Sequence, residues 1–130
     1  MIRNSISYFI DQNYSYKELV IIDDGNTFLK DKIQTHRNVL YFHLNETASN
    51  ASKRNFGIEQ SQGEIIMHWD EQDTYSYDWV THQVTSLLSL GADASGLDKF
   101  IVQKNNTERT LMVKDPINTE GWLYSATLVY

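Results

Sequence analysis

The apolar run Leu19-Val20-Ile21-Ile22 leads directly into the polar stretch Asp23-Asp24-Gly25-Asn26. A short, continuous apolar run is typical of a strand that is buried on both faces of a parallel sheet, and acidic residues followed by glycine and asparagine are typical of a tight turn. The same pattern recurs where Glu64–Trp69 is followed by Asp70-Glu71-Gln72-Asp73. The sequence therefore predicts two strands that each end in an acidic turn.

Helical and strand-like segments alternate around these two strands. Apolar residues at helical spacing predict helices over residues 2–12, 49–61 and 77–90, and apolar runs predict further strands at Val39–His43, Phe100–Val102, Thr110–Val113 and Ser125–Tyr130. This alternation predicts the α/β fold class, with a mainly parallel sheet flanked by helices. Ligands of such sheets bind beyond the carboxyl ends of the strands, so we expect both acidic turns to face one crevice.

Individual residues of the predicted helices have expected positions. We expect Ala51, Asn55 and Ile58 to form the inner face of the helix at 49–61 and Gly63 to end that helix. Gly91 is expected to end the helix at 77–90, because glycine readily adopts the left-handed conformation found at helix C-termini.

Length and composition indicate a single domain over residues 1–130. A chain of 130 residues and 15.1 kDa is long enough for one core. Its formal net charge of -6 and its lack of a long basic run argue against nucleic acid as a partner, and the absence of cysteine excludes disulfides. No apolar stretch approaches the ~20 residues of a transmembrane helix, and no apolar leader is evident, so we expect a cytoplasmic protein.

The acidic turns are candidate ligand-binding sites. Alternate residues of an extended chain point the same way, so Asp70 and Gln72 would share one side, and Glu71 and Asp73 the other. Carboxylate and amide oxygens favour a hard divalent ion such as Mg²⁺ or Mn²⁺, which could bridge to diphosphate oxygens and stabilise a leaving diphosphate. Alternatively, both turns are ordinary solvated loops, since polar residues dominate strand-to-helix connections.

Four stretches, in this order, resemble the opening of a family 2 glycosyltransferase with the GT-A fold. Ser5–Asn26 resembles the family's first helix, its "Q-T/N-Y" turn and its "ELVIVDDGS" strand. Ser49–Ile58 is similar to the "ARNxGI" helix, and Gln62–Tyr75 is similar to "GEIIxHWDDDDWY", which carries the Asp-X-Asp metal motif. Ala126–Tyr130 resembles the strand "GTLLYRR". The resemblance implies transfer of a sugar from a nucleotide diphosphate donor to an acceptor hydroxyl.

The resemblance also implies roles for individual residues. Asp24 matches the residue that hydrogen-bonds the nucleotide base, with Asp23 as its neighbour. Lys53 and Arg54 lie on the helix that borders the nucleotide pocket, where they would face phosphates. Asp70 matches the first acid of the metal motif, which contacts ribose or metal.

The metal motif differs from the family pattern at one position. Gln72 stands where the family normally has its main metal-binding aspartate, and a neutral amide oxygen is a weaker ligand than a carboxylate. Either Asp73, the next acid, compensates for this difference, or the affinity for the metal is low. The expected cofactor is therefore Mg²⁺ or Mn²⁺, held by Asp70, Gln72 and Asp73.

The chain also departs from the family pattern at both ends. The family begins with a central strand of the type "VSIIIPxYN", whereas this chain starts at the first helix. Neighbouring strands would then have unpaired backbone groups, which are costly when buried. Either the remaining strands close the gap, another chain such as a second copy fills it, or the sheet is rearranged. The acceptor-side half with its acidic base lies beyond Tyr130, so no catalytic base is assigned and the isolated chain is expected to turn over poorly.

Two other functions stay open at this point. A non-catalytic GT-A remnant would bind a nucleotide or a partner without turnover, and the missing parts favour it. A receiver-type domain would use Asp23, Asp24 and Lys104 around a phosphoacceptor at Asp70. A receiver domain, however, has no helix before its first strand.

Aromatic and histidine side chains flank the second acidic turn. His68 is either a metal ligand on the same side as Asp70 or, more commonly for such a residue, a packed and hydrogen-bonded histidine. For Trp69 and Trp79, core packing is the default and stacking on a sugar is the alternative.

Overall fold

The computed structural model describes residues 2–26, 29, 33, 36–97, 99–104, 108–113 and 127–130. Its elements are α1 (Ile2–Ile10), β1 (Leu19–Asp23), β2 (Val39–His43), α2 (Asn50–Gln60), α3 (Trp79–Leu90), β3 (Lys99–Lys104) and β4 (Glu108–Val113). The expected helices and the strands at 19–22, 39–43, 100–102 and 110–113 are confirmed. Residues 125 and 126 of the strand expected at the end of the chain lie outside the described residues.

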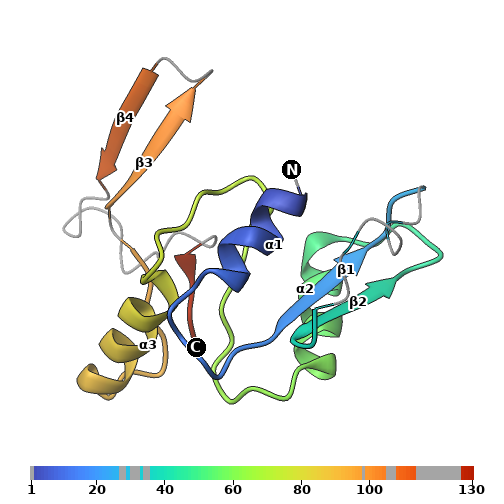
Figure 1. Cartoon of the computed structure of the whole chain (residues 1–130), viewed down its shortest axis with the longest axis horizontal. Helices are drawn as coiled ribbons and strands as arrows, with labels where there is room; N and C mark the ends of the chain where they lie inside the picture. The colour runs from blue at the N-terminus through green and yellow to red at the C-terminus, as the bar shows by residue number, and fades with distance from the viewer. Residues whose placement is uncertain are drawn as a thin grey trace.

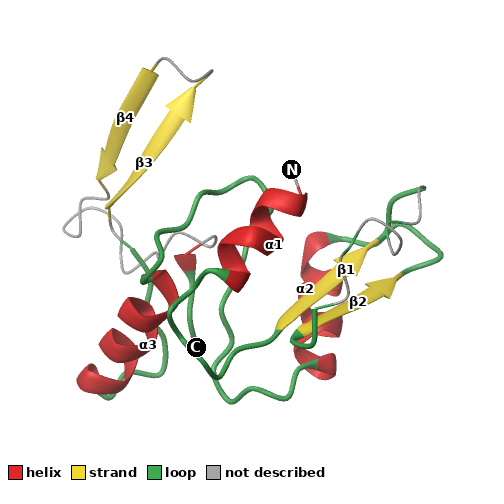
Figure 2. Ribbon diagram, in the orientation of Figure 1, coloured by secondary structure: helices red, strands yellow, loops and turns green. Residues whose placement is uncertain are grey.

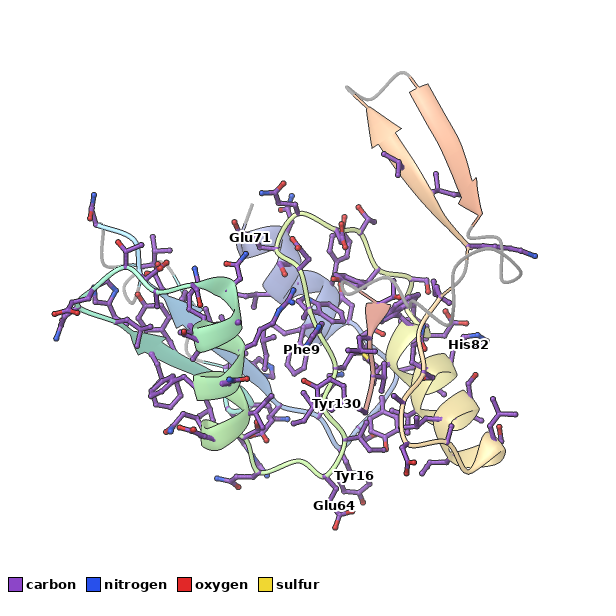
Figure 3. The ribbon with its side chains drawn as sticks, turned by 180° about the vertical axis from the view of Figure 1, so that it is seen from behind. Phe9, Tyr16, Glu64, Glu71, His82 and Tyr130 are labelled. Carbon is purple, nitrogen blue, oxygen red and sulfur yellow. The ribbon has the colours of Figure 1, made fainter. Side chains whose placement is uncertain are left out.

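The β1–β2 pair forms the centre of a three-layer unit. The two strands are parallel, with Leu19 opposite Val39 and Asp23 opposite His43. Successive strand residues point to opposite faces, so one face packs on α1 and the other on α2. Figure 1 shows α2 behind the sheet, and Figure 3 shows the same helix in front of it when the molecule is seen from behind. This arrangement confirms the α/β fold class with a parallel sheet between helices.

The face towards α1 contains the hydrophobic core. Its buried residues are Ile6 and Phe9 of α1, Leu19 of β1, and Ile33. Partly buried side chains pack around them, namely Ile10, Ile21, Leu29, Val39, Tyr41 and Trp69. Alternate residues of β1 and β2 therefore meet α1, as the strand pattern requires, and each fully buried side chain of this kind contributes roughly 1.5–3 kcal/mol to folding.

The expected inner face of α2 is wrong. Ala51 and Asn55 are exposed and only Ile58 is half-buried. The helix instead packs through Phe56, whose ring meets that of Phe42 edge to face at 5.7 Å, and through Gly57, where an added Cβ would lie 3.6 Å from Ile22. A small residue beside an aromatic one brings the helix close to the sheet, so the helix is rotated from the expected face.

The end of α2 also differs from the expectation. Ser61 ends the helix, and its hydroxyl donates to the backbone oxygens of Gly57 and Ile58. The backbone N–H groups of Gln62 and Gly63 instead donate to the Glu18 carboxylate, the latter at 2.9 Å. The segment that follows α2 therefore starts beside the first residue of β1. Gly91 ends α3 in the left-handed conformation, with φ of 57°, as expected.

Residues 64–69 make fewer strand contacts than the sequence predicts. Met67 forms an isolated antiparallel bridge with Val129, and the Ile66 and Tyr130 backbones exchange hydrogen bonds of 2.6 and 3.0 Å. Within the described ranges, no backbone hydrogen bond joins this segment to β1. The gap expected from the missing first strand is thus not closed by the described strands.

Gln12 fixes α1 relative to the start of α3. This buried side chain donates to the backbone oxygens of Tyr8 and Ser76, and its carbonyl oxygen accepts the Val80 N–H at 2.9 Å. Lys17 donates to the backbone oxygens of Ile10 and Gln12, which satisfies carbonyls at the end of α1. The helix that covers the core is therefore held at its C-terminal end by polar contacts.

The β3–β4 hairpin projects from the rest of the domain (Figure 2). Its strands are antiparallel, with Lys99 opposite Val113, and Ile101 is 65% exposed. Across the ranges that the structure describes, none of the helices has the length and apolar character needed to cross a membrane.

Candidate functional site

The turn after β1 is organised by Asp23. Its carboxylate accepts hydrogen bonds from the Tyr41 hydroxyl at 2.6 Å and from the Gly25 N–H at 3.0 Å, and it lies 3.6 Å from His43. Burial acts to raise the pKa of Asp23, but these hydrogen bonds outweigh it and hold the pKa below its ordinary value. Asp23 is thus an ionised carboxylate committed to shaping the turn.

Asp24 connects the same turn to the start of α2. One carboxylate oxygen accepts the Ala48 N–H at 3.0 Å, and the other lies 2.9 Å from the Lys53 ammonium. The Ala48 hydrogen bond and the Lys53 contact lower the pKa of Asp24. The two residues that the resemblance assigns to base and phosphate therefore bind each other, a pairing that sequence spacing does not reveal.

The start of α2 is a favourable place for an anion. Ser49 caps the helix by accepting the Ser52 N–H at 3.1 Å, and the first turn has no acidic residue. Arg54 is exposed and, among the described residues, has no hydrogen bond or ion pair. Helix N-termini attract negative charge, so Arg54 and Lys53 add two cations where the backbone already favours an anion.

The second acidic cluster is a closed turn. The Asp73 N–H donates to the Asp70 backbone oxygen at 3.4 Å, and the Gln72 N–H donates to the Asp70 carboxylate at 3.0 Å. The pairing of Asp70 with Gln72 on one side and of Glu71 with Asp73 on the other was expected from an extended backbone, and that premise is wrong because the backbone is folded here. Burial and the neighbouring charge of Asp70 raise the pKa of Asp73.

Tyr75, the last residue of the stretch that resembles the family's metal motif, anchors this turn, a role that sequence reasoning missed. Its ring is buried and stacked on Trp69, with 3.7 Å between ring centroids. Its hydroxyl accepts the Asp70 N–H at 2.7 Å, and burial raises the pKa of the phenol. Trp69 is fixed in turn by its indole N–H, which donates to the Ser5 hydroxyl at 2.8 Å.

Replacing Tyr75 by phenylalanine is expected to loosen the turn while the ring stays stacked on Trp69. The lost hydrogen bond to the Asp70 N–H should lower the free energy of unfolding by about 1 kcal/mol. Urea denaturation measures this loss, and faster amide hydrogen exchange at Gln72 and Asp73 locates it. The control is Tyr77→Phe, since Tyr77 is 67% exposed. Equal effects of the two variants would contradict the anchoring role.

The structure supports packing, as opposed to ligand binding, for His68 and Trp69. His68 lies edge to face with Tyr130 at 5.7 Å, and its Nε2 is 3.3 Å from the Tyr130 hydroxyl. Trp69 meets Phe9 edge to face at 6.2 Å within the core. Neither side chain is therefore a free ligand for a metal or a sugar.

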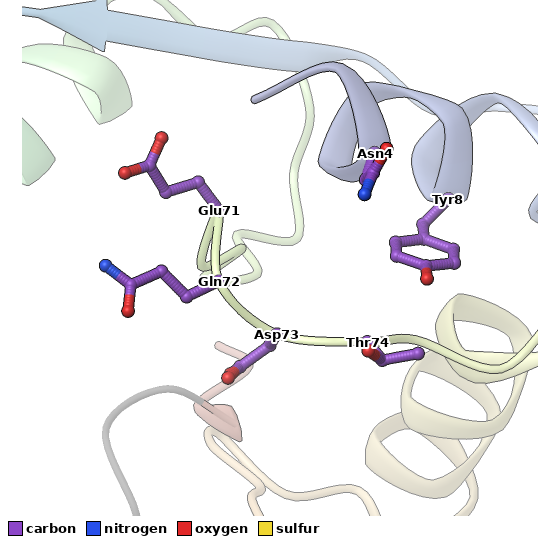
Figure 4. Close-up of a pocket in the computed structure, with 6 residues that line it drawn as sticks. All are labelled: Asn4, Tyr8, Glu71, Gln72, Asp73 and Thr74. Carbon is purple, nitrogen blue, oxygen red and sulfur yellow. The ribbon is translucent and has the colours of Figure 1, made fainter. Parts of the chain in front are cut away.

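A pocket of about 270 Å³ lies between α1 and the second acidic turn (Figure 4). It is lined by Asn4, Tyr8, Glu71, Gln72, Asp73 and Thr74. Sequence reasoning missed Asn4 and Tyr8; their four-residue spacing, which places two polar side chains on one helix face, is the available signal.

The two acidic clusters are not joined by any hydrogen bond or ion pair between the residues that the structure describes. In the same ranges, no group of three or more histidine and acidic side chains gathers as a metal site. Each cluster nevertheless follows a segment that begins beside Glu18 and packs against α1. The first cluster follows β1, and the second follows residues 64–69. Figure 3 shows Glu64 and Glu71 at opposite ends of the body, so residues 64–71 traverse it. The shared crevice stays a prediction.

Comparison with known proteins extends these observations. The sequence matches the family described as "Glycosyl transferase family 2" over residues 1–126. It is 30% identical over 84 residues to an uncharacterized glycosyltransferase of Haemophilus influenzae, covering 61% of this chain and 34% of that protein. It is 26% identical over 119 residues to the putative teichuronic acid biosynthesis glycosyltransferase TuaG of Bacillus subtilis, covering 77% of this chain and 46% of that protein.

The chain therefore spans about a third to a half of the length of these two relatives. The family match excludes the receiver interpretation, as does α1, which precedes β1. With the parallel strands, the acidic turns and the match over nearly all of its length, the chain belongs to family 2 of the glycosyltransferases.

Proposed function

We propose that this domain binds a nucleotide diphosphate sugar and provides the donor side of sugar transfer to an acceptor hydroxyl. The observation that carries the proposal is the pairing of Asp24 with Lys53 at the start of α2, because it gathers a hydrogen-bond acceptor and a cation at one place. A nucleotide diphosphate presents a base N–H donor and an anionic chain, which are the complementary groups.

Asp24 would accept from the base, and Lys53 and Arg54 would bind the diphosphate. Arg54 supports this assignment because it is exposed, lies next to Lys53 on α2 and has no partner among the described residues. Asp23 has a supporting role, since its contacts with Tyr41 and Gly25 hold the turn in shape.

The residues of the second acidic turn fit a divalent cation whose remaining ligands come from the substrate. Burial and, after it, the charge of Asp70 raise the pKa of Asp73, so the two carboxylates repel each other. Mg²⁺ is commonly held by one or two carboxylates plus substrate phosphates. Asp70 and Asp73, with the amide oxygen of Gln72, would hold Mg²⁺ or Mn²⁺. When bound, the cation supplies charge neutralisation of the leaving diphosphate.

The acceptor, the donor sugar and a catalytic base are not assigned to this chain. A second copy that takes the place of the family's first strand, and a cytoplasmic location, stay predictions. The alternative function is a non-catalytic nucleotide-binding module, which would use the same Asp24 and Lys53 contacts without transfer.

Calorimetry with UDP, GDP and TDP, and with a glucose or mannose conjugate of each, tests the proposal in the presence of MnCl2. We expect one nucleotide family to bind and EDTA to weaken that binding. Release of free sugar or its transfer to an added acceptor supports the enzyme, and binding without turnover supports the non-catalytic module. No binding of any nucleotide would overturn both.

A further inference from the structure

We propose that the pocket between α1 and the turn at 71–74 receives the sugar ring of the donor, and that Asn4 and Tyr8 of α1 position this ring. The proposal rests on the donor-binding function proposed above. It assigns α1 a role beyond its contacts with the core, which include the hydrogen bond from the Trp69 indole N–H to the Ser5 hydroxyl.

The pocket borders the residues proposed to hold the diphosphate through a cation. Asp73 lines it, and Asp70 forms the turn that closes on Asp73. In a nucleotide diphosphate sugar, the sugar is bonded to the terminal phosphate, so it must lie next to the site that holds that phosphate. Figure 4 shows Asn4 and Tyr8 on the side of α1 that faces the 72–74 segment, with Thr74 below the Tyr8 ring.

The lining groups are suited to a molecule with many hydroxyls. None of the six lining side chains is aliphatic, and within the described residues no hydrogen bond is formed by the Asn4 amide, the Tyr8 hydroxyl or the Thr74 hydroxyl. The Asn4 amide and the Tyr8 hydroxyl both donate and accept. A sugar hydroxyl does the same, so each can pair with a ring hydroxyl.

Charge and size favour the sugar over the diphosphate. Glu71, which is not one of the proposed cation ligands, gives the lining a negative charge that repels a free phosphate but not a neutral ring. A volume of about 270 Å³ is just below the roughly 300–1,000 Å³ of pockets that hold drug-sized ligands. The pocket is therefore large enough for a single ring and smaller than the usual pocket for a drug-sized ligand.

The test compares the affinities for a nucleotide diphosphate and its sugar conjugate in Tyr8→Phe and Asn4→Ala. Tyr8→Phe removes one hydroxyl and keeps the half-buried ring. We expect each variant to bind the nucleotide sugar about tenfold more weakly, which is the effect of one lost hydrogen bond, and to bind the nucleotide alone as the unmodified protein does. Calorimetry with UDP and UDP-glucose, and with GDP and GDP-mannose, measures the difference.

Tyr16→Phe is the matched control, since Tyr16 is 92% exposed and lies at the far end of the body from Glu71 (Figure 3). Thermal unfolding confirms that the variants fold. If the unmodified protein binds a nucleotide and its sugar conjugate, but the variants weaken neither or weaken both equally, the pocket assignment is wrong and donor binding stands. If the unmodified protein binds no nucleotide at all, donor binding fails and the pocket assignment fails with it.

Discussion

Asp70→Asn is expected to abolish the Mn²⁺-dependent part of nucleotide-sugar binding. Asparagine keeps an oxygen that can accept the Gln72 N–H, now 3.0 Å from the Asp70 carboxylate, so the turn should persist. The change removes the negative charge that a divalent ion requires. Loss of a residue that merely supports a metal ligand already costs 10–100-fold in affinity, so loss of a ligand should cost at least about a hundredfold.

Calorimetry with and without MnCl2 measures this effect, using the nucleotide sugar that the unmodified protein binds. Glu64→Gln is the matched control, because it removes one exposed carboxylate at the opposite end of the body from Glu71. The control should retain metal-dependent binding. If Asp70→Asn binds as tightly as the unmodified protein in the presence of Mn²⁺, the metal assignment of the turn is wrong.

The layered part of the fold could be predicted from the sequence because it follows from local patterns. The run Leu19–Ile22 is apolar at every position, and in the structure it has a helix on each face. Val39–His43 pairs with it in parallel register, as expected for two strands joined by a crossover. Both features can be predicted from the pattern of apolar residues along the chain alone.

The rotation of α2 could not be predicted in the same way. The contact of Gly57 with Ile22 and of Phe56 with Phe42 depends on how closely two separate elements approach. Likewise, the strand expected at Glu64–Trp69 needs a partner on each side, and in the described residues only Met67 has a bridge. Sequence patterns state which residues are apolar, whereas these outcomes depend on which surfaces meet.

The candidate site, like the fold, could be predicted from the sequence only in part. The acidic residues were recognisable from their position at strand ends, but the pairing of Asp24 with Lys53 joins positions 29 residues apart. The Asp70–Asp73 turn is closed by backbone hydrogen bonds and by the Tyr75 hydroxyl. Such contacts depend on tertiary geometry, and they change the interpretation of the site from free ligands to groups that are already partnered.

Lys53→Met is expected to change the affinities for nucleoside and nucleotide diphosphate in opposite directions. Both oxygens of Asp24 are occupied, one by the Ala48 N–H and one by the Lys53 ammonium. A base N–H would share one of these oxygens with its present donor, and where that donor is the Lys53 ammonium each weakens the other's hydrogen bond. Removing the ammonium frees that oxygen, so binding of uridine or guanosine should strengthen severalfold, while a diphosphate should bind about ten- to a hundredfold more weakly, the effect of one lost charged hydrogen bond.

Arg54→Met is the comparison that isolates the competition. It removes a neighbouring cation that has no partner in the described part of the chain, so it should weaken diphosphate binding and leave nucleoside affinity unchanged. Calorimetry at low salt measures both ligands, and thermal unfolding shows whether either variant is destabilised. Nucleoside affinity that falls in Lys53→Met would mean that the ion pair only supports the loop before α2. The expected result is that Lys53→Met binds the nucleoside more tightly and the diphosphate more weakly, while Arg54→Met loses only diphosphate affinity. This result would mean that a bound diphosphate draws Lys53 away from Asp24 and thereby opens the site for the base.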